Sequence, residues 1–310
     1  MGATLAALDA EDLPAASELL AAACSHDRVA AVAGEKLFGR CPHAAPKAFG
    51  VRKRGILVGV AAACCDRIRV LAVHPAARRE GLGTMLLRAC EAEIYGRAAR
   101  RVRLLDEPGN YLAPGVDVAN GELLRWLERR GYARRDEHVN LLVDVRTNPR
   151  VSAARADELA DRVRAAGYEV RRARRDETDA LSAAVSRGFG GAWPFEIERA
   201  IANDPPGLHI ACREGRLAAF AAHDGNNQGL GWFGPSGTWP EHRGRGLGEA
   251  LLLACLVDIA VAHAAAEIAW IGPREFYERS VGTIGERRFA VMTRDNPLRR
   301  PTIPPQSRSG

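Results

Sequence analysis

Apolar and polar residues follow two different periods along this chain, and the changes of period divide it into short elements. Alternating or continuous apolar stretches of a few residues, bounded by Gly, Asp or Arg, predict strands. Leu86, Leu87, Cys90 and Ile94 instead recur at the spacing of one helix face. The first half is therefore predicted to contain a hairpin at 49–65, a strand at 68–73, a helix at about 82–97, a strand at 101–106, a helix at 121–131 and a last strand at 139–145.

The second half repeats this order. A helix is predicted at 152–167, and the segment 208–225 mirrors the first hairpin. Residues 229–240 take the place of the central strand, 247–264 form the following helix, and 266–272 form the next strand. The recurrence of whole elements indicates a duplicated unit rather than one large domain.

The repeat is clearest where each central strand meets its helix. The segments VHPAARREGLGTMLLRAC (73–90) and TWPEHRGRGLGEALLLAC (238–255) align without a gap. The offset is 243 − 78 = 165 residues, which is about the size of one small α/β domain. Four features match between the copies: Pro75 with Pro240, Arg78 with Arg243, Gly81 with Gly246, and Gly83 with Gly248.

A boundary between the two units is predicted at Thr147–Arg150, which is polar, contains a proline and follows a strand. We therefore expect an N-terminal domain at 1–148 and a C-terminal domain at 149–295. Residues 296–310 are rich in proline and polar residues, and we expect them to form a flexible tail.

The repeated string suits the binding of a bulky anion. Glycine at 81 and 83 allows close approach of the backbone, and the first amides of the following helix have no internal acceptors. The helix dipole adds partial positive charge there, and nearby arginines reinforce it. Neither the nucleoside-triphosphate loop nor the Gly-x-Gly-x-x-Gly dinucleotide motif is present. A turn that merely needs small residues is the plainer alternative, and the duplication argues against it.

Arg-x-x-Gly-x-Gly between a strand and a helix, with Val/Thr-x-Pro upstream, resembles the acyl-CoA site of the GNAT N-acetyltransferases. Both halves carry it, so the resemblance covers nearly the whole chain apart from the tail. Tandem members such as mycothiol synthase can combine a catalytic second unit with a degenerate first one. The resemblance implies an α/β (α+β) fold of two tandem domains, each with a mixed, mostly antiparallel, splayed sheet flanked by helices.

The resemblance also implies where acetyl-CoA binds. The pantothenate arm is expected along the strand backbone at Leu71 and Val73 in the first half and at Gly237 and Thr238 in the second. The pyrophosphate contacts are expected at Arg78, Arg79, Gly81, Leu82, Gly83 and Thr84, and at Arg243, Gly244, Gly246, Leu247, Gly248 and Glu249.

Members of this family often use a tyrosine in the helix after the next strand as general acid toward the departing thiolate. Tyr277 stands in that context, although its spacing to Gly282 is one residue longer than usual; a core aromatic is the alternative reading. The first half has Leu127 there, which cannot donate a proton. The general base stays open: Glu196, Glu198 and Asp224 are candidates, and a water chain could replace them.

Three tryptophans of the second half could line an acceptor pocket or serve the core or an interface: Trp193, Trp232 and Trp270.

Composition narrows the remaining choices. The formal net charge of +6 arises from scattered arginines, so nucleic acid is not an expected partner. No apolar run is long enough for a membrane span, and the opening residues do not resemble a secretory signal. The cysteines show no metal-binding spacing, so we expect no metal, buried thiols and a cytoplasmic protein. They are Cys24, Cys41, Cys64, Cys65, Cys90, Cys212 and Cys255.

We therefore expect an acyl-CoA-dependent N-acetyltransferase that transfers an acetyl group to a primary amine of a small molecule. Two alternatives stay open: a transferase with another acyl or aminoacyl donor, carried by a protein or a tRNA, and a non-catalytic acyl-CoA sensor. The amine acceptor and the oligomeric state are not encoded in any motif.

Overall fold

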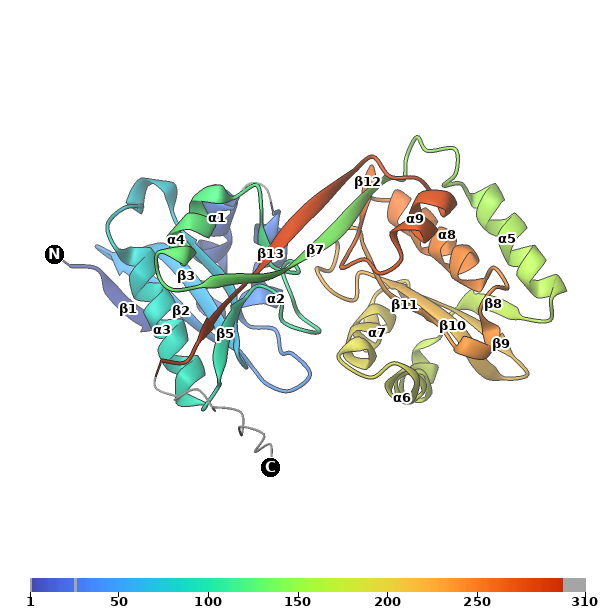
Figure 1. Ribbon diagram of the computed structural model, residues 1–310, viewed down its shortest axis with the longest axis horizontal. Coiled ribbons are helices and arrows are strands. Elements are labelled where there is room, and N and C mark those ends of the chain that lie inside the picture. The colour runs from blue at the N-terminus through green and yellow to red at the C-terminus, as the bar shows by residue number, and fades with distance from the viewer. Residues whose placement is uncertain (1, 25–26, 298–310) are drawn as a thin grey trace, which may run out of the picture.

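The computed structural model, which describes residues 2–24 and 27–297, has two lobes joined by two long antiparallel strands (Figure 1). These are β7 (Ala133–Asp144) and β13 (Gly285–Asp295). Most of the segment expected to be a tail, residues 298–310, lies outside the described part of the chain. Among the described residues, no helix combines the length and apolar character needed to cross a bilayer.

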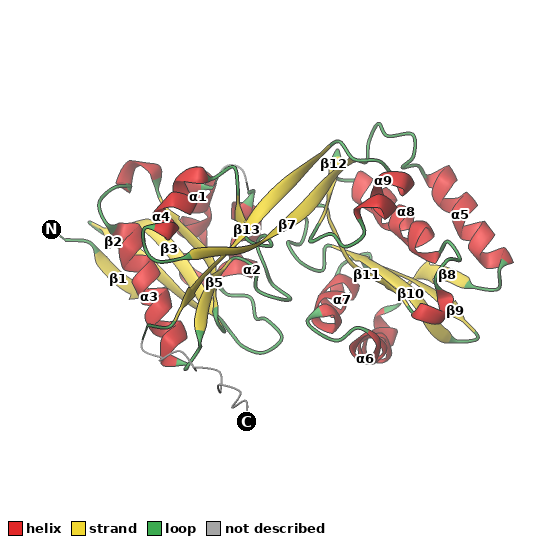
Figure 2. Ribbon diagram, viewed as in Figure 1, coloured by secondary structure: helices red, strands yellow, loops and turns green. Residues whose placement is uncertain are grey.

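Helices flank the sheet in the N-terminal lobe (Figure 2). The predicted helix at 82–97 and strands at 68–73 and 101–106 are present, and the strand predicted at 139–145 begins earlier, at Ala133. In chain order, before β7, the elements are β1 (Thr4–Ala7), η1 (Ala10–Asp12), α1 (Leu13–Ala23), η2 (Val29–Val32), α2 (Ala33–Leu37), β2 (Lys47–Lys53), β3 (Ile56–Cys64), β4 (Arg67–Val73), η3 (Pro75–Ala77), α3 (Leu82–Gly96), β5 (Arg101–Leu104), β6 (Val116–Asp117) and α4 (Gly121–Glu128).

The C-terminal lobe repeats the plan, and its long helix ends at Ala260 rather than at the predicted Ala264. Before β13, its elements are α5 (Ala153–Ala165), β8 (Glu169–Arg172), η4 (Arg175–Glu177), α6 (Thr178–Gly188), α7 (Trp193–Ala202), β9 (Leu208–Arg213), β10 (Arg216–His223), β11 (Trp232–Thr238), η5 (Pro240–His242), α8 (Leu247–Ala260), β12 (Ala265–Ile268) and α9 (Arg274–Ser280). The predicted fold class, a mixed and mostly antiparallel sheet with helices in each of two repeats, is confirmed.

The last strand of each half crosses to the other half. Within the described residues the strands form one sheet in the order β1-β2-β3-β4-β5-β13-β7-β12-β11-β10-β9-β8. β7 pairs with β12 of the second half, and the end of β13 pairs with β5 of the first, from Thr293↔Arg103 to Asp295↔Arg101. The division at residue 148 follows the chain, but in space each half completes its sheet with a strand of the other.

The hydrophobic core of each half also contains side chains from the strand of the other half. Leu141 and Val143 of β7 are fully buried in the cluster built around α8 of the second half. Ala290 and Met292 of β13 are fully buried in the cluster built around α3 of the first half. Since burial of apolar side chains is the main favourable term in folding, each half contributes directly to the stability of the other.

A cluster of buried polar side chains lies at the interface between the two halves, which we call the seam. The Nζ of Lys36 on α2 donates to Asn110 Oδ1, to the carbonyl of Tyr111 and to Asn226 Oδ1, at 2.9–3.0 Å. Glu35 accepts from the backbone amides of Asn227 and Gln228 in the second half, at 3.0 and 3.1 Å. Because Lys36 donates to residues of both halves and Glu35 accepts from amides of the second, this cluster fixes how the halves meet.

Candidate active site

Each half has a tight loop between its central strand and the following helix. Gly81 is the N-cap of α3 with φ +82°, and Gly246 is the N-cap of α8 with φ +80°. Two residues before each glycine the backbone is also left-handed, at Arg79 (φ +69°) and Gly244 (φ +73°). Positive φ favours glycine, so the matched glycines are required by the turn itself. The turn aims the first helical amides out of the loop, which is the geometry that an anion needs.

The matched arginines fold back onto their own strands. The Nε of Arg78 donates to the carbonyl of Val73 at 3.3 Å, and the Nε of Arg243 donates to the carbonyl of Thr238 at 3.2 Å. Arg79 is exposed and faces Glu122 at 3.4 Å. The matched arginine of the repeat therefore holds the strand end against the loop in both halves, and both arginine residues are exposed at the loop.

The other loop residues differ in whether their side chains point into the core or toward the next helix. Leu82 and Leu247 are buried in their cores, so only their backbones face the loop. A Cβ on Gly83 would lie 3.5 Å from Trp126 of α4, and a Cβ on Gly248 would lie 3.5 Å from Phe276 of α9. An aromatic ring of the next helix therefore lies within van der Waals reach of each of these glycines.

The next position differs between the halves. Thr84 accepts a hydrogen bond from Arg130 Nη2 at 2.7 Å, and that guanidinium stacks on Trp126. Its counterpart Glu249 accepts from Arg155 Nη2 at 2.8 Å. In the second half the acidic side chain beside the loop is thus neutralised by an arginine.

Both central strands separate from their parallel neighbours at the same point. β4 pairs with β5 only at Arg67↔Arg103 and Ile68↔Leu104, and β11 pairs with β12 only at Trp232↔Glu267 and Phe233↔Ile268. Beyond these pairs one edge of each central strand has no strand partner among the described residues. Unpaired backbone donors and acceptors can bind an extended amide-containing ligand in the manner of an added strand.

The predicted strand residues lie on those free edges. Leu71 and Val73 pair with β3 on their other side, and Gly237 and Thr238 pair with β10. A Cβ on Gly237 would lie 2.6 Å from the ring of Phe189. Glycine at this position therefore makes room for the aromatic ring.

Tyr277 is largely buried and lies beside the point where β11 separates from β12 in the second half. It is 8% exposed, and its ring packs against Phe276 and Phe233, with centroids 5.0 and 6.3 Å apart. Burial raises the pKa of its hydroxyl above the ordinary value, and the hydroxyl of Ser236 on β11 offsets part of the rise. The phenol is therefore protonated at neutral pH, as a proton donor must be.

The first half differs at two matched positions. Leu127 stands in the place of Tyr277 and is fully buried in the core of that half. At the bulge of β4, Arg69 is fully buried and donates to Glu107 and to the carbonyl of Gly39 at 2.5 Å. Arg69 lies outside every motif of the sequence, although the 165-residue offset matches it with Gly234.

Gly234 leaves space where Arg69 fills it. A Cβ on Gly234, where φ is +126°, would have no heavy atom within 4 Å. The backbone bulges here, because the register of β10 against β11 shifts between Ala221 and His223. The second half therefore has open space beside the bulge of β11. In the first half, the side chain of Arg69 occupies the matching position beside β4.

The open candidates for the general base lie in different settings. Glu196 on α7 is 5% exposed, and burial raises its pKa to about 7. Glu198 is exposed and accepts from Ser182. Asp224 accepts from the amides of Gly229 and Gly231 and holds its own loop. Glu196 is thus a buried carboxylate that can exchange a proton near neutral pH.

The three tryptophans divide between two places. Trp193 stacks on Phe189, 5.3 Å away, in an aromatic group that also contains Phe220 and Trp239. Trp232 and Trp270 surround Tyr111 of the first half, with ring centroids 5.9 and 5.5 Å away. Trp232 and Trp270 therefore belong to the seam between the halves.

Two groups of described residues have the chemistry of metal ligands: Cys41, Cys64, Cys65 and Glu107; and His209, His223 and Asp258. Asp258 already accepts from Arg172 at 2.7 Å and faces His209 and His223 at 2.6 and 3.2 Å. Burial opposes ionisation there, but these hydrogen bonds outweigh it and lower the pKa of Asp258. The histidine group is thus a satisfied polar network.

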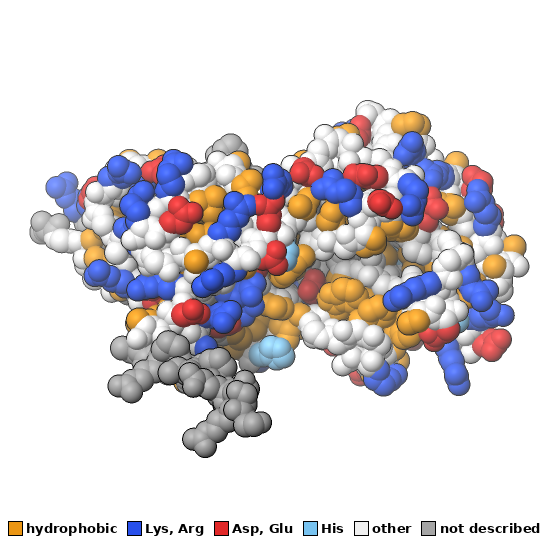
Figure 3. Space-filling view, viewed as in Figure 1, with side chains coloured by type: hydrophobic (Ala, Val, Ile, Leu, Met, Phe, Trp, Pro, Cys, Tyr) orange, Lys and Arg blue, Asp and Glu red, His pale blue; other side chains and the backbone are white. Residues whose placement is uncertain are grey.

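Charged side chains of both signs are interspersed over the face drawn in Figure 3, without one dominant patch. This distribution is consistent with the scattered arginines of the sequence.

Comparisons with known proteins agree with this geometry. Three solved structures share the fold over 94–95% of this chain: a glucosamine N-acetyltransferase region of a fungal β-N-acetylglucosaminidase (18% identity, TM-score 0.72), a GCN5-related N-acetyltransferase from Sphaerobacter thermophilus (20%, 0.63) and a tandem GNAT protein of the clavulanic acid pathway (20%, 0.66). The matches cover 38%, 95% and 98% of those chains. No curated protein matches this sequence.

The family model described as the acetyltransferase (GNAT) family matches residues 15–114 and 173–283, which together make up more than half of the chain. Neither matched region includes the exchanged strands β7 and β13. The protein is a tandem member of the GNAT acetyltransferase family.

Proposed function

We propose that the protein transfers an acetyl group from acetyl-CoA to a primary amine of a small molecule, and that the chemistry takes place in the second half. The observation that supports this assignment is the coincidence of three features there. The strand edge beyond Phe233 is free, the space beside Gly234 is open, and the buried phenol of Tyr277 stands next to Ser236 of the same strand. The first half has only the free edge.

The residues divide the work as follows. The amides after Gly246 and the guanidinium of Arg243 would bind the pyrophosphate, while the backbone of Gly237 and Thr238 would hold the pantothenate arm. Acetyl-CoA supplies the activated acyl group. The amine nitrogen bonds to the acyl carbon, the carbon–sulfur bond breaks, and the amine loses a proton.

Tyr277 would donate its proton to the departing sulfur. A thiolate is stabilised as it leaves if a hydroxyl is positioned to protonate it, and such groups contribute about 10²–10⁴-fold to rate. The raised pKa of Tyr277 keeps the phenol in the donating form across neutral pH. Glu196, whose pKa of about 7 lies near the working range, is our candidate to accept the amine proton, directly or through water.

An acetyl-CoA turnover screen tests this function. Free-thiol release is followed with amino sugars, amino acids, aminoglycoside-type amines and peptide N-termini as acceptors. Turnover that requires both acetyl-CoA and one class of small amine supports the proposal. CoA binding by calorimetry without turnover on any amine would instead favour the sensor, and turnover only with an acylated carrier protein or aminoacyl-tRNA would favour the other donors.

A further inference from the structure

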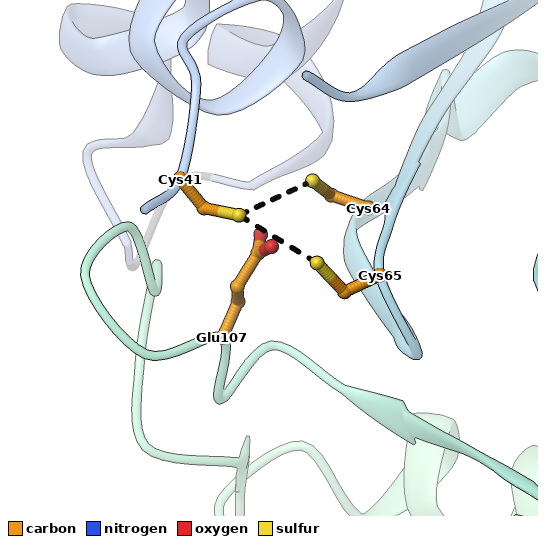
Figure 4. A group of neighbouring side chains, drawn as sticks. All are labelled: Cys41, Cys64, Cys65 and Glu107. Atoms are coloured by element: carbon orange, nitrogen blue, oxygen red, sulfur yellow. Dashed lines mark hydrogen bonds between the residues drawn. The ribbon is translucent and has the colours of Figure 1, made fainter. Parts of the chain in front are cut away.

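We infer that Cys41, Cys64, Cys65 and Glu107 form a structural zinc site in the first half. The four side chains come from three separate segments and point toward one another (Figure 4). Their ligand atoms all lie within 4.8 Å of each other. The sequence predicts no metal here, because the spacing from 41 to 64, 65 and 107 matches no zinc motif and only the fold brings these residues together.

The sulfur positions fit a tetrahedral metal. Cys41 Sγ lies 3.6 Å from Cys64 Sγ and 3.6 Å from Cys65 Sγ. Zinc binds thiolates at about 2.3 Å, and a tetrahedron with that radius has an edge of about 3.8 Å. A disulfide needs sulfurs about 2.05 Å apart, and Cys41 faces two cysteines equally rather than one partner. The arrangement thus matches a shared ligand better than a bond between two of the sulfurs.

The turn at Cys65 explains how two neighbouring cysteines can face one point. Cys65 is the first of two residues in the turn between β3 and β4, and its φ is +52°. This conformation lets the side chains of adjacent Cys64 and Cys65 converge on Cys41, although successive strand residues normally point to opposite faces. Arg54 and Glu214 begin the turns of the other two hairpins with nearly the same φ, so the convergence of the two sulfurs, and not the strain of the turn, is the evidence for a shared ion.

The surroundings of Glu107 resemble the second layer of a metal site. Glu107 is 1% exposed, and its Oε2 accepts from Arg69 Nε. Its other oxygen, Oε1, is buried and accepts from no nitrogen or oxygen donor among the described residues, so the thiols of Cys41 and Cys64 are the groups that face the carboxylate. A thiol is a weak donor to a buried carboxylate, and a metal ion would satisfy this oxygen more fully. Arg69 would then orient the carboxylate and offset part of the negative charge of the ligands.

Zinc suits these ligands better than other common ions. Thiolates are soft ligands that select zinc over calcium or magnesium, and three cysteines with one further protein ligand close a four-coordinate structural site. Cys41 and Cys64 are buried, whereas Cys65 is partly exposed and offers the route by which an ion enters.

The location gives the site a role. Glu107 begins the segment that carries Asn110 and Tyr111 into the seam with the second half. A Cβ on Gly109 would meet both Pro42, next to Cys41, and Phe195 of the second half. A metal would therefore tie the loop at Cys41, the hairpin tip at Cys64–Cys65 and this segment into one unit, and would fix the surface on which Glu196 of the second half rests.

Metal binding tests the inference without any measurement of acetyl transfer. The reduced, metal-free full chain is titrated with Co²⁺, a spectroscopic substitute for zinc. We expect one equivalent to produce thiolate-to-cobalt absorption in the near ultraviolet and tetrahedral bands in the visible, and one equivalent of Zn²⁺ to abolish both. Zinc should also raise the melting temperature and protect three thiols from a thiol reagent. Protein purified under reducing conditions should contain about one zinc per chain by elemental analysis.

Variants locate the bound ion. Cys65→Ser removes a partly exposed ligand, and its zinc affinity should fall at least ~100-fold, since even second-layer changes cost 10–100-fold. Its melting temperature should no longer respond to zinc. Cys212→Ser, at a similarly half-buried cysteine outside the cluster, should behave as wild type. Absence of cobalt–thiolate absorption in the reduced protein, equal spectra for Cys65→Ser and wild type, or a Cys41 disulfide in protein purified without oxidant would each overturn the inference.

Discussion

The two halves share a loop and a splayed sheet, yet they differ at the two positions where chemistry would occur. In the second half, Gly234 leaves open space beside the bulge and Tyr277 offers a buried phenol. In the first half, the matched residues are Arg69, which fills its space, and Leu127, which is part of the core. A duplicated loop is therefore weak evidence for a duplicated active site.

The reason is that the loop has a folding task of its own. Gly81 and Gly246 start their helices in a left-handed conformation, and Arg78 and Arg243 hold the ends of their strands. These needs persist whether or not a ligand binds. At the bulge and on the following helix the halves instead carry different residues: Arg69 and Leu127 are buried in the first half, whereas Gly234 leaves space beside the bulge of the second.

The largest expected effect concerns the exchanged strands. A chain that ends after residue 284 lacks β13, so the first half loses the partner of β5 and the core residues Ala290 and Met292. We expect it to be insoluble or largely unfolded, because each such buried apolar side chain contributes about 1–3 kcal/mol and the sheet is left open. A chain that ends at residue 297 is the matched control and should fold as wild type by circular dichroism. A well-folded 1–284 chain with normal first-half stability would contradict the strand exchange.

Glycine variants in the two loops compare the halves as cofactor sites. Gly246→Val places a β-branched residue at φ +80°, and we expect it to abolish CoA binding to the second half. Gly81→Val makes the same change in the first half and should reduce stability while turnover of the folded fraction persists. Calorimetry with CoA and thiol-release kinetics separate the two outcomes. If Gly81→Val lost turnover and Gly246→Val kept it, the chemistry would take place in the first half, and the proposal would be contradicted.

A pH series tests the environment of Glu196. Its folded pKa of about 7 lies above its ordinary value of 4.5, so the folded state binds this proton more tightly than the unfolded state. The stabilisation is fully present below about pH 4.5 and is lost as pH rises through 7, by an amount on the order of 3 kcal/mol. Glu196→Gln should flatten this part of the profile of unfolding free energy against pH, whereas Glu198→Gln, at an exposed site, should not. An unchanged profile in Glu196→Gln would show that this carboxylate is not buried as described.

The sequence predicted what is local. The helix starts, the turn glycines and the contrast between Leu127 and Tyr277 follow from short strings that interact mainly with themselves or with the next element. The residues of β7 indicate a strand, but no local pattern shows that its partner is β12 of the other half. The sequence also does not predict the cluster of Cys41, Cys64, Cys65 and Glu107. Its members meet only after the hairpin and the 106–112 segment are packed.

The most direct test of the central claim is the turnover number of Tyr277→Phe with the amine found in the screen. The substitution removes one hydroxyl and keeps the ring contacts with Phe276 and Phe233. The matched control is Tyr132→Phe in the first half, which also removes a buried hydroxyl, one that donates to Glu91 at 2.9 Å. We predict that Tyr277→Phe lowers kcat at least ~10-fold with little change in CoA affinity, because a positioned acid contributes about 10²–10⁴-fold. Tyr132→Phe should keep the kcat of wild type. Full activity in Tyr277→Phe would contradict the assignment of chemistry to the second half through this phenol.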